Sequence, residues 1–143
     1  MLAGDETLVA QAREWRHRHG GTLFEMWPYA AAGLAGLRLR APRMPSYVDH
    51  AQAIAAALTD VPGVEVVPAP PPTPMMHLYL QGDADVLDSA LRRIASEQRL
   101  WTWGSTSRTD LPGWQVVELS VGDATLEFSP AEVAAILADI LSG

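Results

Sequence analysis

The sequence predicts an α+β protein in which N-terminal helices precede a small, mostly antiparallel sheet with helices on one face. Before residue 60, apolar residues recur at helical spacing. Beyond residue 61, short stretches of alternating polarity appear between two further helical stretches. A proline-rich segment, 68–74, can be neither a helix nor a central strand. We therefore expect a helical segment over residues 1–60 and an α+β domain over residues 61–143.

The first expected helix spans residues 5–18 and ends in a basic cluster. Leu8 and Trp15 lie on one apolar stripe of this helix. Arginines and histidines crowd its last turn, where positive charge suits the helix dipole. The glycine pair Gly20 and Gly21 then ends the helix.

A second expected helix, residues 23–40, is nearly uncharged in its first two thirds. Thr22 and Glu25 have the spacing of a capping box at its start. Pro28 lies deep for that start, so either the helix begins later, with Pro28 in its first turn, or it is kinked there. A helix that is apolar all round is normally buried, and we see no segment in the sequence that would cover it.

The remaining elements follow from Pro45 onward. Pro45 opens a third helix with one apolar face, formed by Tyr47, Ala51, Ile54, Ala55 and Leu58. The strands expected after it are 64–67, 75–80, 100–103 and 114–121, with a helix at 85–98 and a last helix opened by Ser129 and Pro130. In the helix at 85–98 the apolar stripe is Val86, Leu87, Ala90, Leu91 and Ile94.

Composition excludes several classes of function. The chain has 143 residues, a net charge of −7 and 48% apolar residues, so it can bury a core but does not suit nonspecific nucleic-acid binding or an anionic membrane surface. Without cysteine it forms neither disulfides nor thiolate metal sites. The apolar stretch around Ala30 is too short for a convincing membrane span, and no secretory signal is visible, so the cytoplasm is the expected compartment.

One stretch carries a family resemblance. The segment Leu-Ala-Gly-Asp at 2–5, a helical run, Trp15-Arg16 and then Gly20-Gly21 together resemble the threonine aldolase and β-eliminating lyase family. Those enzymes use pyridoxal phosphate (PLP) on a fold-type I scaffold, and this chain resembles their C-terminal part over nearly its whole length. The resemblance implies the small domain of a lyase that cleaves β-hydroxy-α-amino acids or catalyses β-elimination.

The chain also departs from that family at the positions that carry chemistry. All ten of its basic side chains are arginine, whereas PLP enzymes need a lysine amine to hold the cofactor. An arginine that reaches the cofactor phosphate in the family matches about Phe24 here, and one that grips the substrate carboxylate falls near Trp114. We therefore expect no catalytic residue in this chain and no activity from it alone.

The basic end of the first helix is a candidate for cofactor binding. Its residues are Arg16, Arg18, His19, Gly20 and Gly21, and they could face the cofactor phosphate. We favour the alternative, a helix C-terminus decorated with cations, because phosphates usually prefer helix N-termini. No metal site is expected, since His17 and His19 are two residues apart and point to different sides of a helix.

Two further groups have both a functional and a structural interpretation. His77, Tyr79 and Glu118 share the less apolar face of the expected sheet, which by resemblance would turn toward the large domain and the active-site cleft. An ordinary half-solvated sheet surface is the interpretation that we favour. Trp101 and Trp103 could form an aromatic platform for a ligand, although a packed cluster is the better explanation.

Two hypotheses for function follow. The first is the small domain of a threonine aldolase-like, PLP-dependent lyase, completed by an N-terminal PLP-binding half or by a homo-oligomer partner. The alternative is a non-catalytic α+β interaction module that uses the apolar helix 23–40 to bind a second copy or another partner.

Overall fold

The computed structural model describes residues 3–143, so Leu2 of the family motif lies outside the described residues. The chain divides into two compact units, which we call the N-terminal unit, Met1–Arg43, and the C-terminal unit, Met44–Gly143. The expected boundary at residue 60 therefore differs from the observed division. The third helix packs into the core of the C-terminal unit, because its apolar face matches the sheet that follows it.

The N-terminal unit consists of α1 (Glu6–Arg18), α2 (Trp27–Leu39) and the short 3-10 helix η1 (Ala41–Arg43). Asp5 caps α1 by accepting a hydrogen bond from the Thr7 amide at 2.9 Å. None of the residues described between positions 3 and 43 is buried. This unit is helical but has no core of its own.

The start of α2 corrects the expected range 23–40. The helix begins at Trp27, with Pro28 in its first turn, so the later start is right. The expected capping box does not form, because Glu25 adopts a left-handed backbone with φ of 58°. Proline is well tolerated only in the first turn of a helix, and this sets the start of α2.

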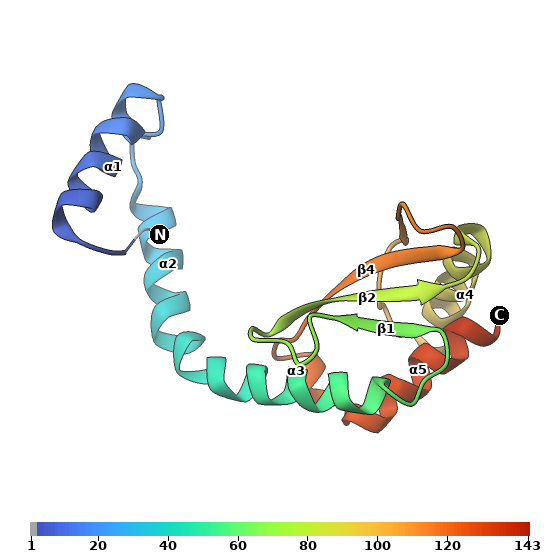
Figure 1. The fold of residues 1–143 in the computed structure, drawn as a ribbon. Helices are drawn as coiled ribbons and strands as arrows, with labels where there is room; N and C mark the ends of the chain where they lie inside the picture. Colours follow the sequence, from blue (N-terminus) through green and yellow to red (C-terminus); the bar gives the residue numbers. More distant parts are fainter. Residues whose placement is uncertain (1–2) are drawn as a thin grey trace. The chain divides into compact units, whose positions relative to one another are not determined.

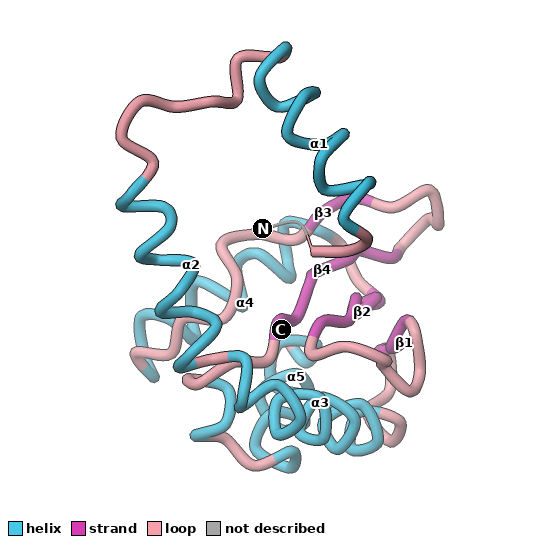
Figure 2. Tube along the Cα trace, turned by 90° about the vertical axis from the view of Figure 1, so that its left-hand side faces the viewer, coloured by secondary structure: helices cyan, strands magenta, loops and turns pink. Residues whose placement is uncertain are grey.

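The C-terminal unit has the predicted α+β architecture (Figure 1). Its elements are α3 (Met44–Leu58), β1 (Val64–Val67), β2 (Met75–Gln81), α4 (Ala84–Gln98), β3 (Ser107–Arg108), β4 (Trp114–Ser120), η2 (Thr125–Glu127) and α5 (Pro130–Ser142). The four strands form one sheet in the order β1-β2-β4-β3, and every neighbouring pair is antiparallel. Figure 2 shows α3 and α5 side by side beneath the strands.

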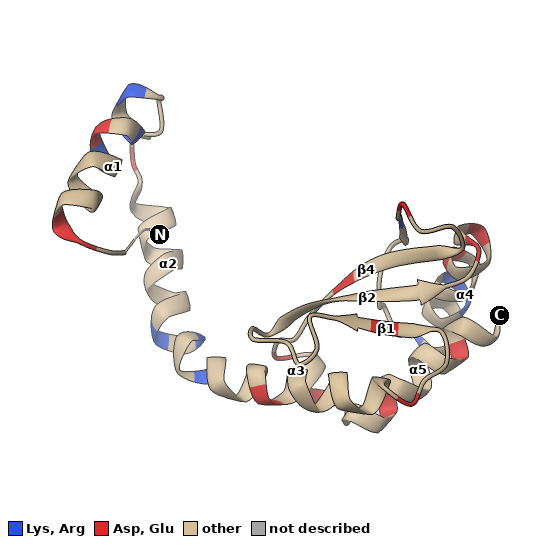
Figure 3. Ribbon diagram, in the orientation of Figure 1, with Lys and Arg blue, Asp and Glu red and all other residues tan. Residues whose placement is uncertain are grey.

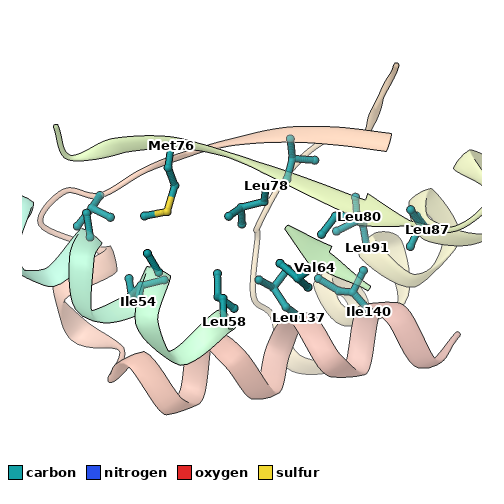
Figure 4. Close-up of a cluster of buried hydrophobic side chains, with 14 of the residues drawn as sticks. Ile54, Leu58, Val64, Met76, Leu78, Leu80, Leu87, Leu91, Leu137 and Ile140 are labelled. Carbon is teal, nitrogen blue, oxygen red and sulfur yellow. The ribbon is translucent and has the colours of Figure 1, made fainter. Parts of the chain in front are cut away.

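One hydrophobic core joins the sheet to the three long helices of this unit (Figure 4). Alternation along β2 points Met76, Leu78 and Leu80 into this core, and each is fully buried, as the sequence predicts. The helices contribute Ile54 and Leu58 from α3, Leu87, Leu91 and Ile94 from α4, and Leu137 and Ile140 from α5. All five residues of the predicted α3 face are buried, whereas Val86, predicted on the apolar stripe of α4, is 54% exposed.

The strand predicted at 100–103 is wrong. That segment has no strand, and the edge of β4 pairs instead with Ser107 and Arg108, where no strand was predicted. Trp103 still reaches β4, because its indole Nε1 donates a 2.7 Å hydrogen bond to the carbonyl oxygen of Glu118. A side chain thus takes the place of the expected backbone pairing.

The start of α5 and its contact with α4 are fixed by polar groups. Ser129 and Glu132 form the predicted capping box, with the Ser129 amide donating to the Glu132 carboxylate at 2.7 Å. Arg93 of α4 donates to the Asp139 carboxylate at 2.9 Å.

Across the described residues, no helix is long and apolar enough to cross a membrane.

Candidate functional sites: the end of α1 and the open face of the sheet

The glycine pair after α1 is explained by the way in which the helix ends. Gly20 has a φ of +70°, and its amide donates to the carbonyl oxygen of His17 at 3.2 Å. The Gly21 amide donates to the carbonyl oxygen of Arg16 at 2.8 Å, which completes a Schellman motif. A Cβ atom at Gly21 would lie 2.9 Å from Arg16 Cγ. Both glycines are therefore required by the helix stop itself.

The cations at this end are partly engaged within α1. Arg18 forms a 3.2 Å ion pair with Glu14, and its guanidinium lies 5.7 Å from the centre of the Trp15 ring. His19 stacks on Trp15 with ring centres 5.4 Å apart. An anion here would meet the carbonyl end of the helix, so the geometry supports the interpretation as a cationic helix terminus.

The strand register brings His77, Tyr79 and Glu118 to one side of the sheet. His77 lies directly opposite Glu118, and Tyr79 lies opposite Val116. We call this side, which points away from the helices, the open face. His77 and Glu118 are exposed, and Tyr79 is half-buried.

This face lacks an activated pair of catalytic side chains. The Glu118 carboxylate accepts a hydrogen bond from the Ser120 hydroxyl at 3.3 Å, and no hydrogen bond joins His77 to Glu118 in the described structure. Nor do three or more His, Asp or Glu side chains gather as a metal site anywhere in residues 3–143. On the open face, His77 and Glu118 are thus cross-strand neighbours without a hydrogen bond between them.

Two hollows mark the open face and its border. One, of about 330 Å³, is lined by His77, Glu118, Trp103, Ser105, Ser107 and two valines of β4. The other, of about 450 Å³, is lined by Glu65, Val67, Tyr79, Leu111 and Trp114. Neither Glu65 nor Trp114 is among the site residues predicted from the sequence. The signal that finds them is the antiparallel register of β1, β2 and β4, which puts both beside Tyr79.

The two tryptophans of segment 100–103 do not form a packed cluster. Trp101 is 74% exposed, and Trp103 is half-buried against the core. Both line a third hollow of about 340 Å³ that also contacts Phe128 and Leu137. Trp101 loses its expected packing because segment 100–103 does not join the sheet.

Comparison with known proteins bears out the family resemblance. No family model matches the sequence, and no curated protein is significantly similar to it. Among solved structures, the chain is similar to a proposed aromatic amino acid beta-eliminating lyase/threonine aldolase from Exiguobacterium sp. 255-15, with 31% identity and a TM-score of 0.79. It is also similar to a proposed L-allo-threonine aldolase from Listeria monocytogenes EGD-E, with 26% identity and a TM-score of 0.80.

Each match covers 98% of this chain but only 39% of the solved chain. The C-terminal unit has the α+β fold of the small C-terminal domain of threonine aldolase-like enzymes, as the resemblance implied. The chain thus resembles the C-terminal part of such a lyase and spans well under half the length of either solved protein.

Proposed function

We propose that the chain is the C-terminal part of a threonine aldolase-like, PLP-dependent amino-acid lyase that works in the cytoplasm. In the complete enzyme the reaction would be cleavage of a β-hydroxy-α-amino acid or β-elimination. The observation that carries the proposal is 31% identity over 98% of this chain and 39% of its solved neighbour. The remaining length of such an enzyme would supply the reaction centre.

The residues of this chain do not fit covalent attachment of PLP. The sequence has no lysine, and thus no side-chain amine that could hold the aldehyde of the cofactor. The end of α1 presents carbonyl oxygens rather than free amides to an anion, so we assign Arg16 no more than an outer contact to the phosphate. We therefore assign no catalytic step to this chain, and we propose that it positions and encloses a centre held elsewhere.

The exposure of α2 supports the need for a partner. Trp27 is 70% exposed, Tyr29 67% and Leu39 71%, although all three are apolar or aromatic. With about 150–250 Å² on a large buried aromatic side chain, Trp27 and Tyr29 together expose roughly 200–340 Å². This is a quarter or more of the ~800 Å² that each partner buries in an interface of standard size.

A chimera tests the proposal. The part of the Exiguobacterium lyase that this chain covers would be replaced by this chain, and the purified protein would be tested for PLP absorbance and for threonine cleavage. We expect PLP absorbance to be restored relative to the same lyase truncated before the replaced part. Threonine cleavage should rise with it but stay below that of the intact lyase, because Phe24 and Trp114 stand where the resemblance implies arginines. A soluble chimera that binds no more PLP than the truncated protein would contradict the proposal, and so would an insoluble one, since the interfaces would then not match.

The alternative is a non-catalytic module that uses the expected helix 23–40, observed as α2, to form a homodimer. The observation that favours it is the lack of any lysine together with the lack of a buried residue among positions 3–43. Sedimentation of the purified chain distinguishes the two proposals. A stable dimer without affinity for PLP, combined with an inactive chimera, would favour the module.

A further inference from the structure

We propose that the hollow formed by Glu65, Tyr79 and Trp114 on the open face binds the guanidinium of an arginine side chain. We call it the Glu65 hollow. This inference deepens the proposed function, on which it rests for the source of the arginine: the protein part that completes the enzyme and faces the sheet. The binding chemistry itself depends only on residues of the C-terminal unit.

Register places the three side chains around one spot. Glu65 of β1 lies directly opposite Tyr79 of β2. Tyr79 lies opposite Val116 of β4, and Trp114 is two residues from Val116 along the same strand. Tyr79 and Trp114 are therefore diagonal neighbours on one face, at a separation that aromatic side chains bridge. The result is a carboxylate beside two aromatic rings.

The loop before β4 holds the rim of the Glu65 hollow in place. The Trp114 amide donates to the Leu111 carbonyl oxygen at 3.2 Å. The Thr109 hydroxyl donates to the Trp114 carbonyl oxygen at 2.9 Å. Leu111 is 57% exposed and forms one wall with Val67, which is 46% exposed. The hollow of about 450 Å³ is thus preformed and has room for one long side chain.

The charge of this surface is unbalanced. Within the described chain, the Glu65 carboxylate accepts no hydrogen bond and forms no ion pair. The strands β1, β2 and β4 contain no arginine, and Figure 3 shows acidic but no basic bands on them. Residues 44–143 carry thirteen acidic side chains against four arginines. A cation is therefore the complement that this face lacks.

Guanidinium fits this combination better than ammonium does. A planar guanidinium stacks on an aromatic face while its fork of donors binds a carboxylate. An ammonium group is compact and more strongly hydrated, so it gains less from rings that stay half-exposed. An anion would be repelled by Glu65. An uncharged apolar group would leave the carboxylate unpaired.

The test follows the indole NMR resonances of the five tryptophans in the whole 143-residue chain. Trp114→Phe identifies the Trp114 signal. N-acetyl-arginine amide is the probe, and N-acetyl-citrulline amide, its uncharged analogue, is the control. We expect a saturable shift of the Trp114 signal with the arginine probe, weakened by added salt, and a far smaller shift with citrulline.

Two matched variants locate the charge. Glu65→Gln should weaken arginine binding roughly fivefold, the upper range for an exposed ion pair. Glu118→Gln, on the same face but outside the hollow, should leave binding unchanged. Both sites are exposed, and the four other indole signals report whether either variant is still folded.

Several outcomes overturn the inference: no saturable shift with the arginine probe, an equal shift with citrulline, or unchanged binding in Glu65→Gln. Failure of the chimera with intact arginine binding would discard the proposed enzyme and keep the Glu65 hollow as a site. An active chimera without arginine binding would keep the proposed enzyme and discard the Glu65 hollow as a site. The two proposals can therefore fail separately.

Discussion

The two units differ in how much of their apolar surface is buried. In the C-terminal unit, leucines, isoleucines and methionine from one sheet face and three helices meet in a core with almost no exposure. In the N-terminal unit, α1 and α2 are equally regular, yet Leu34 and Leu37 on α2 remain 47% and 45% exposed. Helical backbone alone therefore gives no core, because most helix stability in proteins comes from packing of an apolar face.

The two units also differ in their balance of basic and acidic residues. Residues 1–43 carry six arginines and four acids, whereas the C-terminal unit is strongly acidic. The N-terminal unit thus combines unburied apolar surface with positive charge, which is typical of a segment that completes its packing on another surface. The two units should therefore respond very differently to the same kind of mutation.

The largest difference is expected for a leucine-to-alanine pair. Leu137→Ala in the core should lower the free energy of unfolding by about 2–5 kcal/mol, because it removes buried contacts and leaves a cavity. Leu34→Ala on α2 should change it by less than about 0.5 kcal/mol. Urea unfolding followed by circular dichroism measures both. A loss above about 1 kcal/mol for Leu34→Ala would mean that α2 packs against the chain itself.

Removing the N-terminal cap of one helix in each unit should have a smaller effect. Ser129→Ala removes the capping box of α5 and should cost about 1 kcal/mol of unfolding free energy. Asp5→Ala removes the corresponding cap of α1 and should lower helical signal without moving the urea midpoint. Equal shifts of the midpoint in the two variants would show that α1 unfolds together with the core.

Acid titration gives the smallest expected effect. The hydrogen bond from Ser129 lowers the pKa of Glu132 below its ordinary value of 4.5. The hydrogen bond from Arg93 likewise lowers the pKa of Asp139 below 3.8. A depressed pKa in the folded state stabilises the protein above the unfolded pKa, and this stability is lost as pH falls through the folded value.

The urea midpoint should therefore fall between about pH 5.5 and about pH 3. The double variant Glu132→Gln with Asp139→Asn should show a shallower fall. Glu14→Gln, which changes an ion pair on α1, is the control and should leave the slope unchanged. A slope in the double variant as steep as in the unmodified chain would rule out both carboxylates as its source.

Much of the fold follows from local patterns in the sequence. Alternation along 75–80 and helical spacing along 47–58 each reflect burial against a single surface, so those faces could be predicted. Segment 100–103 also alternates, but which segment pairs with β4 depends on competition with Ser107 and Arg108, and this is a tertiary outcome. Val86 follows the helical apolar spacing, but the way in which α4 packs turns this residue away from the core, and packing is also a tertiary outcome.

The candidate sites were predictable only in part. The shared face of His77, Tyr79 and Glu118 follows from the period of two along each strand. Glu65 and Trp114 join Tyr79 only through the register between three strands, which spacing along the chain does not determine. The glycine pair ends α1 as predicted, and the Schellman motif explains both glycines without a ligand.

Hydrogen exchange of the whole chain, followed by mass spectrometry at low micromolar concentration, compares the two units in a single measurement. We predict that amides of β2 and β4 exchange only through global unfolding, whereas amides of α1 and α2 exchange orders of magnitude faster. Protection of α2 that rises with concentration would indicate self-association. Protection of α2 as strong as that of β2 at every dilution would contradict the claim that the N-terminal unit lacks a packed core unless a partner covers it.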